Sequence, residues 1–571
     1  MAFVRVIQSK SSTGEIHKYV RVVENRRERG KSRQHVIASL GNVKVLRKDI
    51  KKIVNGLLRA VGERSMVAAE DCRASSTLEF GVRYAAEALW KLLGLDDLIK
   101  GRMKSRRADV EYERWIRMMV VNKLSDPTSK LGIFQWLRGV WWPDHGFDPQ
   151  VVSEEVEPES HLIFCKREVM KIYRAMDYLL PMKEEVERHL YLRLRDLLSL
   201  RVDLVFYDVT SSYFEGDGPP GLAALGYSRD REPGKHQVVI GLIMCNGLPI
   251  GHEVFEGNRV DKKTVKEVVR KLKEQFDIHR CIFVGDRGLV STENLEDLER
   301  NGFDSILALK KRRNKEVREL LLGRGPLIFC RESEDLEWRE MMGEEKTRSI
   351  VCRNPIVAEE QRQRRQRDLK ELDSQLSALQ QKVNARKRPA LKTVVKEAEE
   401  ILRHKHGRRL FTYTVDERSR KFAYCRNHQA LELEEALEGL YILRTKHREL
   451  APLSIIHAYK GLCDVERAFR SMKSVLELRP FYHHLETRVR AHAFICFLAY
   501  LIEKYVEQAL KKAQVGMSAE RAFESLKNMG IAVMKVGQER YGYITEPTFW
   551  QQRILKALGL KTPPRMLVEQ G

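Results

Sequence analysis

Two short runs of apolar residues in the middle of the chain predict strands inside a sheet. Residues 204–207 and 281–285 are nearly all hydrophobic, and an aspartate ends each run, Asp208 and Asp286. Continuous apolar runs of this length are typical of strands buried on both faces. Open α/β folds place their chemistry at the carboxyl ends of such strands. We therefore expect both carboxylates at one rim of a central sheet.

The segment between these two strands predicts a hairpin and a helix. The apolar runs 237–245 and 248–255 are joined by Asn-Gly, which is the strongest short signal for a β-hairpin. Asp261 then stands where it can cap a helix whose apolar residues share one face. After Asp286, a helix from about Thr292 is predicted to lead into a further strand.

This order of elements predicts the fold of the central region. An antiparallel hairpin followed by helix-linked strands is the strand order of a ribonuclease-H-like domain, with the first carboxylate on its first strand. We expect the first part of this α/β domain over 201–310. The pattern stops there and resumes with a strand over 440–445, so the second part is placed at 431–510.

The interruption, residues 311–430, predicts an insertion that contains a long helical hairpin. Apolar residues alternate at spacings of three and four along the first helix, which is a heptad seam. They are Leu369, Leu372, Leu376, Leu379 and Val383. Pro389 breaks the helix, and a second amphipathic helix is expected over 391–402. The seam can pack against this second helix or against another copy of the chain.

Three further regions flank the predicted α/β domain. Residues 1–45 predict a β-hairpin with a basic tip, which is either an arm on a phosphate backbone or simply solvated. Residues 46–200 predict a mainly helical DNA-binding region, and 511–571 a helical C-terminal region. The helical region includes Trp136, Trp141 and Trp142, for which core packing is a commoner use than stacking on bases.

The net charge narrows the class of partner. The chain has 571 residues, a formal net charge of +23 and a pI of about 9.5. Nucleic acid is the usual polyanion that neutralises so basic a protein, although a generally basic proteome is an alternative. The nine cysteines show no paired CxxC pattern and are expected to be reduced. The most apolar stretch, 491–502, is too short to span a membrane, and residues 1–5 lack the apolar core of a signal peptide, so we expect none there. We expect a cytoplasmic, nucleoid-associated protein.

A third carboxylate lies on a predicted helix near the end of the domain. Five residues spaced by three, four, three and four positions share one face of that helix. They are Tyr459, Leu462, Glu466, Phe469 and Lys473. A dry, unpaired carboxylate on an apolar face costs several kcal/mol, and a metal ion shared with Asp208 and Asp286 would remove that cost. Each acid also has an ordinary structural explanation, such as a Glu466–Arg470 ion pair. Carboxylate ligands of this kind suit Mg²⁺ or Mn²⁺.

These residues resemble the DDE transposases of prokaryotic insertion sequences, in the superfamily with a Y-(2)-R-(3)-E-(6)-K signature. Tyr459, Glu466 and Lys473 match that spacing, and Asp208 and Asp286 match the two family aspartates. The resemblance covers roughly residues 200–500 and extends more weakly through the first 200. Leu462 stands where the signature has its arginine.

The resemblance implies a function for each matched residue. Asp208, Asp286 and Glu466 would be the catalytic residues and would hold two Mg²⁺ ions, for which Mn²⁺ can substitute. Tyr459 and Lys473 would contact DNA, and the role of the missing arginine is either absent here or taken over by Arg467 or Arg470. Trp338, in the insertion, would hold a base flipped from the duplex, as in relatives with a hairpin intermediate, or would pack against the inserted helices.

The implied enzyme cleaves double-stranded DNA at the ends of an insertion sequence and joins the freed 3′ ends to target DNA. A homodimer would hold two element ends in the synaptic complex, and no membrane is involved. Two alternatives remain open from the residues. One is a ribonuclease-H-like DNA nuclease without strand transfer, and the other is a domesticated, non-catalytic DNA-binding protein.

Overall fold

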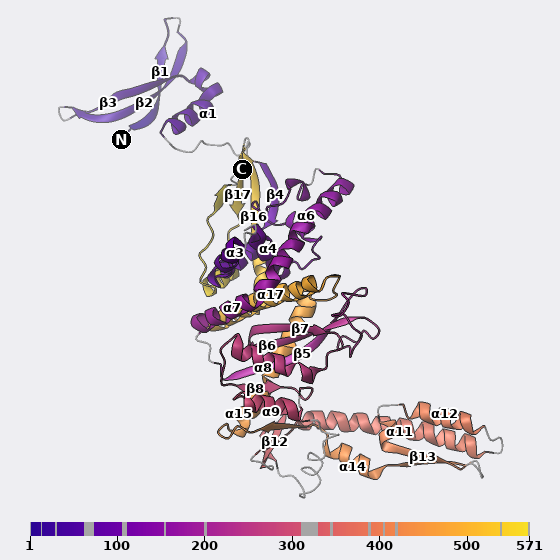
Figure 1. The fold of residues 1–571 in the computed structure, drawn as a ribbon. Coiled ribbons are helices and arrows are strands. Elements are labelled where there is room, and N and C mark those ends of the chain that lie inside the picture. The colour runs from indigo at the N-terminus through magenta and orange to yellow at the C-terminus, as the bar shows by residue number, and fades with distance from the viewer. Residues whose placement is uncertain are drawn as a thin grey trace. The chain divides into compact units, whose positions relative to one another are not determined.

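The structure is a computed structural model in which the chain forms two compact units. It describes residues 2–12, 14–28, 31–61, 73–105, 111–153, 156–198, 202–289, 291–309, 329–342, 347–385, 390–403, 406–416, 421–536 and 539–568. One unit comprises residues 1–78, 531–545 and 564–571, and the other comprises 79–530 and 546–563. Figure 1 labels the elements of both.

The first unit is mainly β-structured. Its three-stranded antiparallel sheet consists of β1 (Ala2–Lys10), β2 (Ile16–Glu28) and β3 (Lys31–Asn42), and α1 (Val43–Ala60) follows. The predicted hairpin is thus part of a larger sheet, and its tip, Arg29-Gly30, lies outside the described residues. A second sheet has the order β18 (Met566–Val568), β17 (Glu539–Ile544), β16 (Gly530–Val536) and β4 (Arg73–Glu79).

The second unit contains a helical region that packs around one long buried helix. Its helices are α2 (Gly81–Leu92), α3 (Leu95–Ser105), α4 (Glu111–Ser125), α5 (Ile133–Leu137), α6 (Pro158–Leu179) and α7 (Lys183–Leu198), joined by α17 (Glu486–Lys512), α18 (Ala519–Lys527) and α19 (Phe549–Ala557). The three tryptophans are at most 7% exposed, so core packing is their role. No described helix is long and apolar enough to cross a membrane.

The C-terminal prediction was only half right. Residues 511–571 were expected to be helical, yet β16, β17 and β18 form strands there. Each strand is short, between three and seven residues, so its local pattern is a weak signal. Pairing with β4 from the other end of the chain supplies the partner, and a local pattern cannot reveal such a partner.

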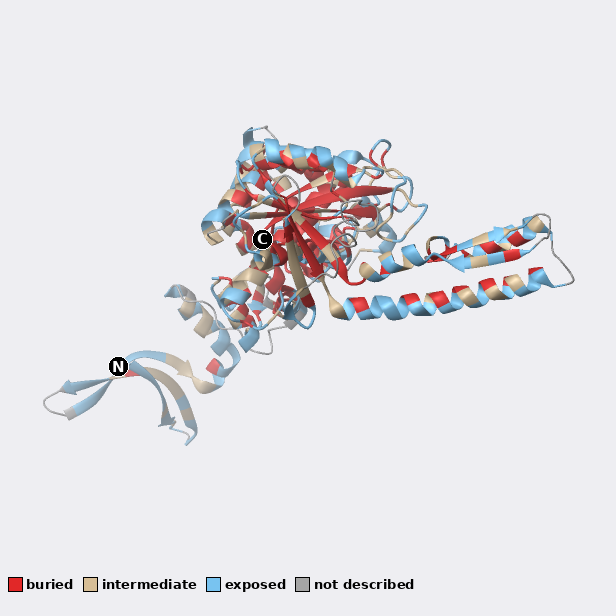
Figure 2. Cartoon of the chain, turned by 90° about the horizontal axis from the view of Figure 1, so that it is seen from below, coloured by how far each residue is buried: buried red, intermediate tan, exposed pale blue. Residues whose placement is uncertain are grey.

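The centre of the second unit is a nine-stranded sheet. Its order is β10 (Cys330–Ser333), β11 (Leu336–Met342), β12 (Arg348–Arg353), β15 (Leu440–Thr445), β9 (Asp304–Ala308), β8 (Ile282–Gly285), β5 (Leu204–Tyr213), β6 (Gln237–Cys245) and β7 (Leu248–Glu256). β5, β6 and β7 pair antiparallel, whereas β5, β8 and β9 pair parallel. This is the predicted ribonuclease-H-like strand order. Figure 2 shows buried residues gathered in the strands of this sheet; β6 is wholly buried, whereas β10 is exposed.

The insertion contains strands as well as the predicted helical hairpin. β10, β11 and β12 extend the central sheet beyond β15. They precede α11 (Pro355–Asn384), α12 (Leu391–Ile401), α13 (Gly407–Leu410), β13 (Phe411–Val415), β14 (Phe422–Arg426) and α14 (His428–Ala436). The heptad residues of α11 pack in one cluster with Val394, Ala398, Phe411 and Phe422. The seam is therefore filled from within the chain.

Candidate active site

Asp208 and Asp286 occupy adjacent positions on neighbouring parallel strands. The register of β5 and β8 pairs Phe206 with Val284 and Tyr207 with Gly285. Asp208 is the next residue of β5 and Asp286 directly follows the end of β8, and neighbouring strands lie only about 4.8 Å apart. One expectation needs correction, because Asp208 does not end its strand. β5 continues to Tyr213, since its antiparallel pairing with β6 persists after β8 has ended.

The alternation of side chains along β5 decides which face carries Asp208. The Tyr207 hydroxyl donates to Thr264 Oγ1 at 2.8 Å, just before α8 (Val265–Glu274). Phe206 lies on the other face, against Gly461: a Cβ at Gly461 would lie 2.7 Å from two atoms of the Phe206 ring. Asp208, two residues after Phe206, shares that second face. This face of the sheet is covered by α15 (Pro452–Lys460) and α16 (Leu462–Arg470).

Tyr459, at the end of α15, orients the second aspartate. Its hydroxyl donates to Asp286 Oδ1 at 3.2 Å, and its ring stacks on Tyr441 of β15 with 5.9 Å between centroids. Burial, then the charge of Asp286, raises the pKa of Tyr459, and the charge of Glu466 acts in the same direction. Tyr459 is therefore a neutral hydrogen-bond donor that holds one carboxylate.

Glu466 lies on α16, but the helix is not continuous as expected. α15 ends at Lys460, Gly461 separates it from α16, and a π-helical turn, Ser471–Val475, follows. Within α16 the buried face is formed by Leu462, Val465, Ala468 and Phe469, whereas Glu466 lies at the edge of this face and is exposed. No ion pair joins Glu466 to Arg470 in the part of the chain that is described. Over the same residues, no three His, Cys, Asp or Glu side chains converge closely enough to hold a metal ion.

Asp208 lies where a negative charge is costly. Burial, together with the nearby charge of Asp286, raises its pKa to about 7, while a hydrogen bond of 2.8 Å from the Val209 amide opposes the shift. Two carboxylates on adjacent strands repel each other when both are ionised. A divalent cation would neutralise both, and hard oxygen ligands are the ones that Mg²⁺ prefers. The donor set therefore fits the metal that the sequence implied.

Lys473 is buried and already engaged. Its ammonium donates to Thr210 Oγ1 at 2.6 Å and to Asp230 Oδ1 at 2.9 Å, and Arg479 also pairs with Asp230, at 2.6 Å. Asp230 is 4% exposed, so this ion pair lies in the interior. A phosphate contact by Lys473 would require breaking it. Lys473 is therefore not on a solvated face.

Leu462, which stands where the family signature has its arginine, is part of the core. Leu462 is 8% exposed and faces inward. Of the two proposed replacements, Arg467 pairs with Asp464 on the exposed surface of α16. Arg470 is exposed and has no ion pair with another described residue. Arg470 is thus the more available of the two for a phosphate.

A further charged pair beside the site was not expected from the sequence. Arg229, in the loop between β5 and β6, binds both carboxylate oxygens of Asp261 at 2.6 Å, and the charges of both residues act on the pKa of Asp208. Asp261 was predicted to cap a helix. It begins a short 3₁₀ turn instead, and α8 starts at Val265 without a side-chain cap. The cluster of charges at 229–231 was the available signal.

Trp338 lies on β11, within the sheet, and not among the inserted helices. It pairs directly with Cys352, which in turn pairs with Tyr441. Directly opposed residues share one face of a sheet, so Trp338, Cys352, Tyr441 and Tyr459 form a row that leads to Asp286. The indole Nε1 is buried and has no hydrogen-bond partner among the described residues.

Comparisons with known proteins identify the chain as a transposase. The family model described as "Transposase DDE domain" matches residues 203–502, and "IS1634 family transposase, N-terminal domain" matches residues 4–71. A search of curated proteins finds no match. Among solved structures, the chain is similar to one titled "Cryo-EM structure of piggyBac transposase synaptic complex with hairpin DNA". The identity is 10%, the TM-score is 0.35, and the match covers 74% of this chain and 70% of that one.

The first family model spans more than half of the 571 residues, and it includes Asp208, Asp286 and Glu466. The enzymes of this family act on DNA and use divalent metal ions. With a ribonuclease-H-like sheet that brings two of these carboxylates together, the chain belongs to the DDE transposase family of insertion sequences.

Proposed function

We propose that this transposase cuts DNA at the ends of its own insertion sequence and joins the freed 3′ ends to target DNA. Asp208, Asp286 and Glu466 would be its catalytic residues. The observation that carries the proposal is the parallel register of β5 and β8, which leaves Asp208 and Asp286 side by side on the face covered by the Glu466 helix.

The three carboxylates would hold two Mg²⁺ ions, or Mn²⁺ in their place. When bound, the ions would activate the attacking oxygen and stabilise the leaving 3′ oxygen. Tyr459 contributes by fixing the orientation of Asp286. Glu466 is exposed, so its side chain is free to turn toward the aspartates without disturbing the core.

Two residues outside the carboxylates, Arg470 and Trp338, would contact the DNA. Arg470, four residues after Glu466, is exposed and has no ion pair with another described residue, and it would contact a phosphate of the strand being cut. Trp338 stands at the far end of the aromatic row that leads to Asp286. We propose that it supports a base displaced from the duplex, because aromatic stacking contributes roughly 1–3 kcal/mol per base and the row leads toward the carboxylates.

The active species would be a homodimer with two element ends, acting at the nucleoid. The heptad residues of α11 are already buried by packing within the insertion, so the two protomers would have to contact each other through another surface. Sedimentation of the protein with end DNA tests this: a single protomer on paired ends would contradict it.

The experiment that tests the reaction uses DNA carrying the inverted repeats that flank the gene. Asp208→Asn, Asp286→Asn and Glu466→Gln should each lower Mg²⁺-dependent cleavage by more than about 10²-fold, with DNA binding retained. Asp464→Asn is the matched control, because Asp464 lies on the same helix and pairs only with Arg467. If one of these three variants still cleaves DNA, the residue that it replaces is not part of the active site.

Strand transfer separates the proposal from a nuclease without joining activity. A pre-cut end supplied with circular target DNA should give joined product. Cleavage without joining would favour the nuclease, and binding without cleavage would favour a domesticated DNA-binding protein.

A further inference from the structure

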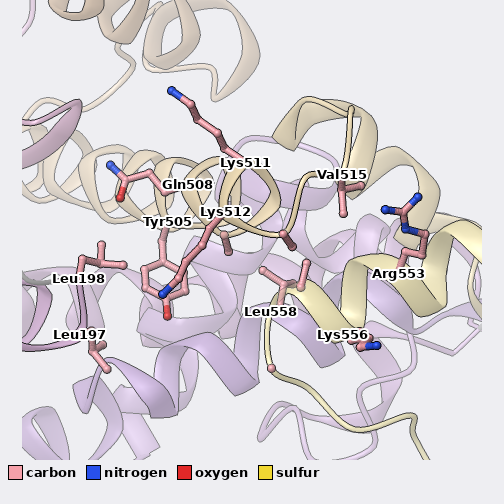
Figure 3. A pocket seen from close by; sticks show the side chains of 14 residues that line it. Leu197, Leu198, Tyr505, Gln508, Lys511, Lys512, Val515, Arg553, Lys556 and Leu558 are labelled. Carbon is pink, nitrogen blue, oxygen red and sulfur yellow. The ribbon is translucent and has the colours of Figure 1, made fainter.

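A large, cationic pocket lies away from the carboxylates, where three helices of the second unit end. Its volume is about 1040 Å³. The C-terminal ends of α7 and α17 form one side, and the last turns of α19 form the other (Figure 3). Tyr505 and Leu558 contribute to an apolar floor. None of the residues that line it is acidic.

Four cations surround this floor: Lys511 and Lys512 from α17, and Arg553 and Lys556 from α19. Figure 3 shows Lys512 beside the Tyr505 ring, with Arg553 and Lys556 on the facing helix. Both lysines of α17 and Lys556 are exposed. Within the described part of the chain, none of the four is paired with a carboxylate.

Helix ends explain only part of this charge. A helix C-terminus carries roughly half a negative charge, which nearby lysines neutralise. Three helix ends therefore account for at most about one and a half of the four positive charges. A surplus of at least about two and a half charges remains, and no acid among the lining residues offsets it.

The outer face of α19 adds exposed aromatic surface. Phe549 and Trp550 are 65% and 46% exposed, and the Arg553 guanidinium lies over both rings, 5.8 and 5.6 Å from their centroids. A capping box at Thr548 and the bond from Gln551 Nε2 to the Ser525 carbonyl, at 2.7 Å, fix the start of this helix. The cations are thus presented by an anchored element.

We infer that this pocket and the adjoining aromatic face of α19, together called the groove, bind the sugar-phosphate backbone of the substrate DNA without reading its sequence. The surplus positive charge matches phosphates, and arginine beside exposed aromatic rings is typical of surfaces that accept nucleotides. DNA is the polyanion on which the family acts. The contact lies outside the cutting reaction, so Asp208→Asn should bind DNA here as the wild type does.

The test is the salt dependence of binding to a fluorescent 30-base-pair duplex of arbitrary sequence, measured by anisotropy. Each phosphate contact contributes about 0.9 to the slope of log K against log salt concentration. Arg553→Ala/Lys556→Ala and Lys511→Ala/Lys512→Ala should each lower the slope by about one to two and weaken binding by more than about tenfold. The two variants alter opposite sides of one groove, so they should agree.

The control is Lys266→Ala/Arg270→Ala, which removes the same two charges from the exposed face of α8. Lys511→Arg/Lys512→Arg should keep the wild-type slope, and circular dichroism checks that each variant is folded. Groove variants that bind like the wild type, or that lose no more than the control, would overturn the inference. So would unchanged DNA binding with altered sedimentation of the free protein, because the occupant would then be a second copy of the chain.

Discussion

A methyl group at Gly461 should displace the Glu466 helix. Gly461 joins α15 to α16, and its backbone angles, φ −61° and ψ −17°, suit alanine as well as glycine. The obstacle is Phe206 of β5: a Cβ would lie 2.7 Å from its Cε1 and Cζ and 3.0 Å from the Ala458 carbonyl oxygen. Gly461→Ala is therefore a steric test of how closely α16 must approach β5.

The size of the effect follows from this geometry. Carbon atoms normally pack about 3.5–4.0 Å apart, so either the helix junction or the Phe206 ring must move by roughly 1 Å. Overpacking of this kind costs about 1–3 kcal/mol of stability. A misplacement of about 1 Å at a catalytic group can lower the rate by about 10²-fold. We expect a folded enzyme that binds DNA normally and cleaves it about 10²-fold more slowly.

The assay is single-turnover cleavage of element-end DNA with saturating Mg²⁺. Phe206→Leu removes the ring atoms that the new methyl group would meet, so adding it to Gly461→Ala should recover at least about tenfold, as contacting sites are not additive. Gly101→Ala is the control, because a Cβ there meets nothing within 4 Å. Wild-type cleavage by Gly461→Ala, or no recovery in the double variant, would refute the reasoning.

Three further predictions concern the aromatic row and two buried lysines. Trp338→Ala should reduce the fluorescence increase of 2-aminopurine placed near the cut, and an unchanged increase would remove Trp338 from the proposed role. Lys473→Ala should destabilise the protein by roughly 2–3 kcal/mol, because buried Asp230 then retains Arg479 as its ion-pair partner and loses Lys473. An unchanged melting temperature, together with a weaker salt dependence of DNA binding, would instead support a phosphate contact by Lys473. Lys130 is buried beside Lys123 and bonds His492 Nδ1 at 3.3 Å, and burial lowers its pKa from 10.5 to about 7. The unfolded chain binds more protons between pH 7 and 10.5, so stability should rise with pH in that window. Lys130→Met should therefore stabilise by up to about 5 kcal/mol at pH 7 and by little at pH 10, whereas equal effects at both pH values would contradict the assignment.

The parts of the fold that could be predicted depend on short-range patterns. The strands of Asp208 and Asp286 are continuous apolar runs, and the hairpin of β6 and β7 turns at Asn-Gly. The α11 seam repeats every seven residues and is buried as a seam should be. These signals lie within one element or one turn, so they do not require knowledge of the chain's path.

The parts that were missed depend on contacts between distant segments. The break between α15 and α16 was not predicted, and Gly461, at this break, lies against Phe206, which is 255 residues earlier in the chain. The ion pair of Lys473 with Asp230, which lies in a distant loop, was not predicted, and the DNA contact of Lys473 stays a prediction. β10, β11 and β12 gain their stability by joining an existing sheet edge. Local periodicity contains no information about such neighbours.

The central claim is that Asp208, Asp286 and Glu466 bind the metal ions themselves, and exchanging the ligand atom tests it most directly. A thiolate is a softer ligand than a carboxylate and favours Mn²⁺ over Mg²⁺. Cleavage by Asp208→Cys, Asp286→Cys and Glu466→Cys should be lost in Mg²⁺ and restored in part by Mn²⁺, whereas the control Asp464→Cys should cleave with either ion. A cysteine variant of the three that cleaves equally well with Mg²⁺ and Mn²⁺ would contradict the claim.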